Sequence, residues 1–513
     1  MEFSSEFGFR LNGEKIFLKG NANHHDLGAL GAASYDRAIE RMMLQLKSFG
    51  YNCIRCSHNP YSDSFARIAD RVGMLVVGEL TDKWSDNDYW GGRQPFTHLW
   101  HKLITEWIKR DRNRPSIILW SLGNELQIRE GWAGFEGTND WGITTYNIFN
   151  QLVKRWDHTR LTTVAMFPAR AGAITRHDKE FNDYLVPPEL ACATEVASFN
   201  YQSDKYDAYL KYQPDLILFQ SEAETSKLLQ PYYNMDRKRT VGMAYWGSAE
   251  YWGESNKWPK KGWNYSFFDH TMRPYPQAYL IKSAFMPEIP EVHIGVVDAA
   301  GAESVSWNDV TVGRMALNEC WNHIPGSRQS LFTYTNAHSV ELLVNGQSMG
   351  VQQNDTTQAN LRNMIYWKDV PYGNGGSVVA IARDKSGKEV ARHRIETAGK
   401  AVALQIETET PADWKADGMD LQYINVTVID KKGRPVWDYN EPLTLQMEGA
   451  ARLVALDNGD HYTDELFHGI TSKRMYQGRM QIILRSDQEA GNVTVKISSA
   501  GLKGTLRLKT IKE

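Results

Sequence analysis

The chain has 513 residues, a formal net charge of −3 and four cysteines. A chain of this length exceeds one domain, so we expect about two to four. The nearly balanced charge does not indicate a nucleic-acid or membrane-surface partner. No apolar run is long enough to span a bilayer. The first residues, Met1 to Ser5, are polar and do not resemble a signal peptide, so the residues alone do not indicate a compartment.

Short apolar runs alternate with helical patterns over residues 1–288. The predicted strands are Lys15–Gly20, Tyr51–Cys56, Met74–Val77, Ser116–Ser121, Thr162–Met166, Val196–Asn200, Leu216–Gln220 and Met243–Trp246. The predicted helices are Asp36–Phe49, Ser62–Val72, Leu99–Lys109, Trp141–Trp156 and Gln277–Met286. Eight β/α repeats over about 250 residues or more predict a TIM (β/α)8 barrel, in the α/β class.

The pattern changes after Pro287-Glu288-Ile289-Pro290, where helical periodicity ends. Alternating runs such as Ser339–Val344, followed by the turn Asn345-Gly346, predict antiparallel strands. A second all-β segment begins near Ala401, and each segment has about 100 residues, the size of an immunoglobulin-like sandwich. We therefore predict a barrel domain over 1–288 and immunoglobulin-like β-sandwiches over 289–400 and 401–513.

Two glutamates follow predicted barrel strands. The apolar run Ser116–Leu122 leads into Gly123-Asn124-Glu125, and Leu216–Gln220 leads into Ser221-Glu222. Barrel enzymes keep their chemistry at the carboxyl ends of the strands. A retaining glycosidase needs two carboxyl groups about 5 Å apart, one as acid/base and one as nucleophile. Glu125 and Glu222 are therefore the candidate catalytic pair, and Glu224 is a weaker candidate for the second position.

Other strand ends supply polar and aromatic partners for this pair. An arginine beside a carboxylate nucleophile favours its ionised form, and histidines can hydrogen-bond sugar hydroxyls. A tryptophan can stack on a sugar ring. The candidates are His24, Arg55, His58, Glu79, Asn200, Tyr201 and Trp246.

Two stretches have metal-like composition. His24-His25-Asp26 lacks a spacing that presents three ligands on one face. Cys53 and Cys56 form a single CxxC inside a strand pattern, which places their side chains on opposite faces. We predict buried structural thiols, no metal and no cofactor.

The segments Asn52–Pro60 and Arg110–Glu125 resemble glycoside hydrolase family 2, the β-galactosidase and β-glucuronidase relatives, in the type seen in gut and marine Bacteroidetes. The resemblance covers Phe7 to about Pro290 and continues more weakly through the two β domains. It implies a carbohydrate substrate and a periplasmic or secreted location, and it leaves the oligomeric state open.

The resemblance also implies a role for each site residue. Glu125 would be the general acid/base, Asn124 the partner of the sugar 2-hydroxyl, Glu222 the nucleophile and Arg55 its support. His24 and His58 would line the glycone subsite, Trp246 would face the sugar, and Asn200 and Tyr201 would belong to a site-lining segment. The implied mechanism is retention through a glycosyl-enzyme, in which the charge on Glu222 favours the protonated form of Glu125.

Two features depart from the family pattern. In the family, a sugar-binding jelly roll and an immunoglobulin-like domain usually precede the barrel, whereas the resemblance in this chain starts with the barrel. The third barrel strand of the family usually ends in Asp-Glu, where this chain has Gly78-Glu79. Asn256-Lys257 resembles the pair with which glucuronidases hold a carboxylate, but the residues around it align better with galactosidase-like members. We predict a retaining exo-β-galactosidase, with a β-glucuronidase or a non-catalytic carbohydrate-binding barrel as alternatives.

Overall fold

The computed structural model describes residues 1–84, 95–126, 142–167, 187–255, 258–298, 302–307, 310–409 and 413–512. The chain forms two compact units. One consists of Met1–His25, Met43–Ser248 and Ser304–Arg314, and the other of Asp26–Met42, Ala249–Glu303 and Met315–Glu513. Among the described helices, none is both long and apolar enough to cross a membrane.

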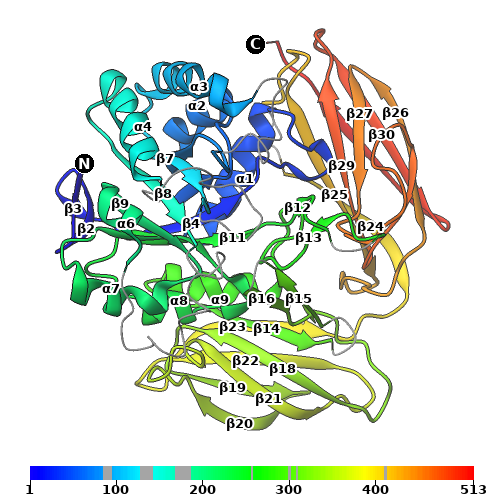
Figure 1. The fold of residues 1–513 in the computed structure, drawn as a ribbon. Helices are drawn as coiled ribbons and strands as arrows, with labels where there is room; N and C mark the ends of the chain where they lie inside the picture. The colour runs from blue at the N-terminus through cyan, green and yellow to red at the C-terminus, as the bar shows by residue number, and fades with distance from the viewer. Residues whose placement is uncertain are drawn as a thin grey trace. The chain divides into compact units, whose positions relative to one another are not determined.

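The first unit is built on a closed barrel of eight parallel strands, β4 to β11, of which β4, β7, β8, β9 and β11 are labelled in Figure 1. Each strand pairs with the next along the chain, and β11 closes the ring on β4. The strands are β4 (Leu18–Asn23), β5 (Cys53–Cys56), β6 (Leu75–Glu79), β7 (Ile117–Asn124), β8 (Leu161–Met166), β9 (Val196–Asn200), β10 (Leu218–Ala223) and β11 (Gly242–Trp246). The predicted TIM barrel is confirmed.

Helices follow the barrel strands along the chain. They are α1 (Asp36–Ser48), α2 (Asp63–Val72), α3 (Phe96–Asp111), α4 (Ile143–Trp156), α6 (Glu189–Ala193), α7 (Tyr206–Tyr212), α8 (Gln230–Asn234) and α9 (Pro276–Phe285), with the short 3-10 turns η1 (Gly28–Leu30), η3 (Ser203–Lys205) and η4 (Thr225–Lys227). Ser62 caps α2, because its side chain accepts a hydrogen bond from the backbone N–H of Phe65. Gly73 ends the same helix in the left-handed conformation.

The first predicted strand is placed too early. Lys15 belongs to a small antiparallel sheet of β1 (Glu2–Ser4), β2 (Gly8–Leu11) and β3 (Glu14–Lys15), and the barrel strand begins at Leu18. Asn12 and Gly13 both have positive φ, and they turn the chain so that Arg10 pairs with Lys15. An Asn-Gly pair is a strong hairpin signal, so the sequence contained this information.

Cys53 and Cys56 lie in β5 as free, buried thiols. Burial raises the pKa of the Cys53 thiol to about 12 and that of Cys56 well above its ordinary value. Such thiols remain protonated and are poor metal ligands. The structure therefore agrees with the structural role predicted for this CxxC.

The second unit contains two pairs of four-stranded antiparallel sheets, drawn in green to yellow and in orange to red in Figure 1. In the first pair, β17-β14-β18-β21 and β20-β19-β22-β23 share one apolar core that includes Trp321 and Trp367. The strands are β14 (Val292–Val297), β17 (Leu317–Asn318), β18 (Arg328–Thr335), β19 (Ser339–Val344), β20 (Gln347–Gln353), β21 (Met364–Pro371), β22 (Ser377–Arg383) and β23 (Glu389–Glu396).

The second pair, β24-β25-β29-β27 and β28-β26-β30-β31, encloses a core around Trp414. Its strands are β24 (Ala401–Thr408), β25 (Leu421–Asp430), β26 (Pro442–Gly449), β27 (Ala451–Asp457), β28 (Ser472–Arg474), β29 (Arg479–Ser486), β30 (Asn492–Ser499) and β31 (Leu502–Lys509). Two short pairs remain, β12 (Tyr251–Trp252) with β13 (Gly262–Trp263), and β15 (Glu303–Trp307) with β16 (Val310–Arg314). The barrel is thus followed by β-sheet domains, as predicted, while the boundaries at 288 and 400 stay predictions.

Candidate active site

The residues predicted as catalytic or substrate-binding lie in the first unit, at or just beyond the carboxyl ends of barrel strands. Arg55 is in β5, Asn124 ends β7 and precedes Glu125, Glu222 is in β10, and Trp246 ends β11; His24, His58 and Tyr201 follow β4, β5 and β9. Parallel strands in a barrel bring these ends together, which is why residues up to 222 positions apart in sequence share one site.

Arg55 is fully buried and joins the carboxylates of the site. Its Nη1 donates to Glu222 Oε1 at 2.7 Å, and its Nε and Nη2 donate to Glu79 Oε2 at 3.0 and 2.7 Å. Nη2 also donates to Asn124 Oδ1 at 2.9 Å. Such charge-assisted bonds are strong and directional, so the guanidinium fixes three side chains from three other strands.

Glu79 is the strand-end candidate to which the sequence reasoning assigned no role. It is fully buried, accepts from Ser121 Oγ at 2.7 Å, and its Oε1 lies 2.6 Å from His58 Nδ1. Burial opposes its charge, but Arg55, His58 and the Ser121 hydrogen bond together lower the pKa of Glu79. Burial likewise opposes charge on His58, yet Glu79 and Asp82 raise the pKa of His58. The signal in the sequence was an acidic residue ending an apolar strand.

The Gly78-Glu79 departure has a steric cause. A Cβ atom at position 78 would lie 3.1 Å from a ring atom of Trp107 and 3.2 Å from one of Trp120. These two rings pack edge to face, with centroids 4.9 Å apart, so an aspartate at position 78 would require them to shift by a few tenths of an ångström. Glycine at this position lets the two rings pack without that shift.

Glu125 is bound by the side-chain amide of Asn200, which other side chains hold in place. Asn200 Nδ2 donates to Glu125 Oε1 at 3.1 Å and to Asn124 Oδ1 at 3.0 Å, and Ser221 Oγ donates to Asn200 Oδ1 at 2.7 Å. Glu125 has a φ of 47° and Tyr201 a φ of 60°, both in the left-handed region that residues other than glycine seldom adopt. Strained backbone of this kind concentrates at functional sites.

Glu222 is almost fully buried. Tyr201 Oη donates to its Oε2 at 2.5 Å, while Arg55 occupies Oε1. Burial raises the pKa of Glu222, as does the charge of Glu125, and Arg55, His58 and Tyr201 oppose that rise. The two predicted glutamates therefore interact electrostatically within one hydrogen-bonded network.

Trp246 is in contact with both predicted histidines. The His58 ring stacks on it with centroids 5.2 Å apart and an interplanar angle of 6°, and His24 meets it edge-on at 5.2 Å. Because His58 covers one face of the indole, a sugar ring could stack only on the other face. His58 also contacts Glu79, and His24 contacts His58, so the two histidines and Trp246 form one cluster, while their role in lining a sugar subsite stays a prediction.

Asp82 is a residue of this network that sequence reasoning missed. Its Oδ1 accepts from Asn124 Nδ2 at 3.0 Å and lies 2.5 Å from Lys83 Nζ. Burial opposes its charge, but Lys83 and His58 lower the pKa of Asp82 to about 2. Nothing in the local sequence marks Asp82, since it follows β6 in a loop. The predicted sugar-selecting pair Asn256-Lys257 lies outside the described residues.

Replacing Glu79 by glutamine is expected to lower the pKa of His58, because the Glu79 charge then no longer opposes the effect of burial and only that of Asp82 remains. The measurement is a pH titration of the His58 ring by NMR on histidine-labelled protein. Ser121→Ala is the matched control, because it removes one hydrogen bond to Glu79 but leaves the charge. A His58 pKa unchanged by Glu79→Gln would contradict the ion pair.

Two models of one protein family match the chain. The model described as "Glycosyl hydrolases family 2, TIM barrel domain" matches residues 5–238, and "Glycoside hydrolase family 2 C-terminal domain 5" matches residues 404–506, together more than half of the chain. The chain belongs to glycoside hydrolase family 2. A domain of unknown function, DUF4982, matches residues 326–391 of this family 2 chain.

The relatives of this chain are named as two kinds of enzyme. A β-galactosidase of Bacteroides ovatus is 27% identical over 97% of this chain and 61% of its own length. A putative β-glucuronidase of Formosa agariphila is 26% identical over 99% of this chain and 50% of its own length. The crystal structure of a family 2 member from Bacteroides cellulosilyticus has a TM-score of 0.86 and 28% identity, covering 100% of this chain and 64% of that chain. The chain thus spans about half to two thirds of the length of these relatives.

Proposed function

We propose that this family 2 chain carries the catalytic site of a retaining exo-β-glycosidase that removes terminal β-galactosyl units from oligo- or polysaccharides. The observation that carries the proposal is the buried network in which Arg55 binds Glu222 while Asn200 binds Glu125. Two carboxyl groups at barrel strand ends, held by separate partners, match the two roles that glycoside hydrolysis requires.

In the first step, Glu222 attacks the anomeric carbon and Glu125 gives its proton to the leaving glycosidic oxygen. The carbon–oxygen bond to the leaving group breaks as the ester to Glu222 forms. Arg55 binds one carboxylate oxygen of Glu222 and Tyr201 binds the other, so the nucleophile is oriented before the sugar binds. Formation of the ester neutralises the Glu222 carboxylate, so Glu125 can become ionised without charge repulsion from Glu222.

In the second step, Glu125 takes a proton from water, and that water attacks the anomeric carbon and releases Glu222. Two displacements at one carbon retain the β configuration. Asn124 Oδ1 already accepts from Arg55 and Asn200, and one N–H of Nδ2 donates to Asp82. The other N–H faces His58 Nε2 in a long contact of 3.4 Å, and it is the group available to a sugar 2-hydroxyl.

The identity of the sugar is proposed from the relatives of this chain. The β-galactosidase of Bacteroides ovatus supports a neutral galactoside. The putative β-glucuronidases of Formosa agariphila support the second candidate, a glucuronide whose carboxylate would meet Lys257.

The proposal is tested with nitrophenyl β-galactoside and β-glucuronide and with NMR detection of the first sugar anomer released. We expect turnover of the galactoside, release of the β anomer, and loss of turnover in Glu125→Gln. Faster turnover of the glucuronide, lost in Lys257→Ala, would replace the galactosidase assignment. Sugar binding without turnover on either substrate would identify a carbohydrate-binding barrel instead.

A further inference from the structure

Glu250, His270 and His461 meet in the second unit, which holds none of the residues of the candidate active site. His270 Nδ1 lies 3.2 Å from Glu250 Oε2, and His461 Nδ1 lies 3.0 Å from the same oxygen. Each of the three residues is at most 4% exposed. Two ring nitrogens therefore converge on one buried carboxylate oxygen.

The His270 ring lies between two carboxylates. Its Nδ1 faces Glu250, and its Nε2 lies 2.8 Å from Asp457 Oδ1. An imidazole that binds a metal ion through Nδ1 keeps Nε2–H as a donor, and the Nε2 to Asp457 Oδ1 distance is that of a hydrogen bond. Metal-binding histidines usually donate their second nitrogen to a carboxylate in this way.

The His461 ring contacts Glu250 through its Nδ1 atom. Among the described residues, no partner accepts or donates a hydrogen bond at its buried Nε2. Trp252 covers both rings, with its centroid 5.2 Å from His461 and 4.5 Å from His270, and so fixes their orientation.

We infer that Glu250 Oε2, His270 Nδ1 and His461 Nδ1 are the protein ligands of a zinc-type divalent metal ion. Around a tetrahedral zinc ion with bonds of 2.0–2.1 Å, ligand atoms are about 3.3 Å apart. The distances of 3.0 and 3.2 Å from Glu250 Oε2 to the two nitrogens are close to that value. Two histidines with one glutamate form a known zinc ligand set that leaves a fourth position for water.

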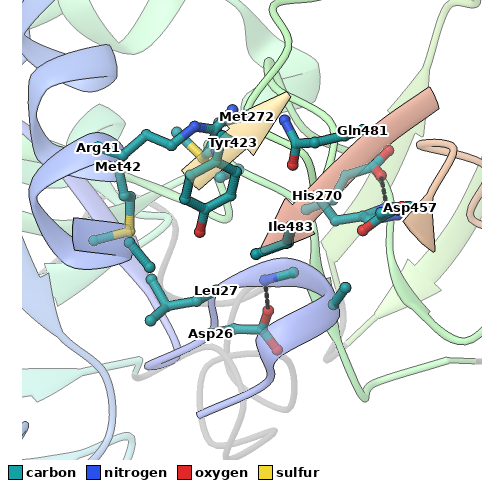
Figure 2. A pocket seen from close by; sticks show the side chains of 15 residues that line it. Asp26, Leu27, Arg41, Met42, His270, Met272, Tyr423, Asp457, Gln481 and Ile483 are labelled. Carbon is teal, nitrogen blue, oxygen red and sulfur yellow. Dashed lines mark hydrogen bonds and ion pairs between the residues drawn. The ribbon is translucent and has the colours of Figure 1, made fainter. Parts of the chain in front are cut away.

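The fourth position is supplied by a cavity of about 20 Å³ that Glu250, His270 and Asp457 help to line. Figure 2 shows His270 and Asp457 joined by a dashed line on one side of this cavity, with Arg41 and Met42 on the other. A space of this volume holds one water molecule, and polar groups around it can bond to that water.

The metal ion would link segments that are distant in the sequence. Glu250 precedes β12, His270 lies between β13 and α9, and His461 follows β27. Binding therefore closes a loop of 211 residues between positions 250 and 461. Because the unfolded chain has no such site, the free energy of metal binding adds to the free energy of unfolding. The proposed role is structural stabilisation of the second unit.

The test uses the full chain freed of metal by a chelator and then titrated with Zn²⁺ alone. We expect one tightly bound ion per chain, a rise in melting temperature on binding, and tetrahedral absorption bands when Co²⁺ replaces Zn²⁺. His461→Ala should weaken Zn²⁺ binding by about a hundredfold or more, and Asp457→Asn by about ten- to a hundredfold.

His393→Ala is the matched control. It belongs to the second histidine–glutamate cluster among the described residues, His293, Glu319 and His393, where His393 Nδ1 already accepts from the Ile294 N–H at 3.1 Å. This variant should bind Zn²⁺ as the wild type does. Wild-type protein that binds no Zn²⁺ tightly, or binds Co²⁺ only with the weak bands of an octahedral ion, would overturn the inference. The same holds if His461→Ala retains the wild-type affinity.

Discussion

Replacing Glu222 by alanine is expected to lower kcat for an aryl β-galactoside by about four to six orders of magnitude, because the attacking group is lost. Azide should restore part of the turnover by occupying the space of the missing carboxylate. Since azide then attacks from the face of Glu222, opposite the leaving group, the product should be the α-galactosyl azide. Product configuration is read by NMR.

Glu125→Ala is the companion variant. It keeps the nucleophile, so azide should replace water in the second step and give the β-galactosyl azide. Glu224→Ala is the matched control, because Glu224 is also a buried glutamate of the same segment but is paired with Lys227, and it should keep most of the turnover. A β-azide from Glu222→Ala, or loss of turnover in Glu224→Ala alone, would contradict the assignment of Glu222.

The barrel and the glutamate pair were predictable because each depends on local sequence. An apolar run such as Ile117–Asn124 marks a strand buried on both faces, and the residue that follows it must lie at the barrel mouth. Glu125 and Glu222 both follow from that rule. Their placement required no knowledge of which side chains would meet.

The contacts between loops were not predictable, because partners there are chosen by three-dimensional geometry. Asp82 meets Asn124 from 42 positions away, and His58 stacks on Trp246 across the closure of the barrel. Glu250 and His461 are 211 positions apart, in segments with different periodicity. No spacing rule joins such residues, so only the structure reveals them.

Replacing Arg55 by methionine is expected to move the acid limb of the pH profile of kcat/KM to higher pH. Arg55 lowers the pKa of both Glu79 and Glu222, while burial raises them. Without the guanidinium, only His58 and Tyr201 of these groups oppose burial and the charge of Glu125, so Glu222 binds its proton at a higher pH and the nucleophile is lost earlier as the pH falls. An arginine beside a carboxylate typically shifts its pKa by about one to three units, which sets the size of the expected displacement.

Arg55→Lys separates charge from geometry. The lysine retains a cation between Glu79 and Glu222 but cannot make the four short donor contacts of the guanidinium to three side chains. It should therefore lower kcat while leaving the acid limb near the wild-type pH. If methionine and lysine move the limb equally, the charge of Arg55 does not control Glu222, and the arginine acts by positioning alone. If methionine moves it and lysine does not, the buried cation is what keeps the nucleophile ionised in a site whose burial opposes charge.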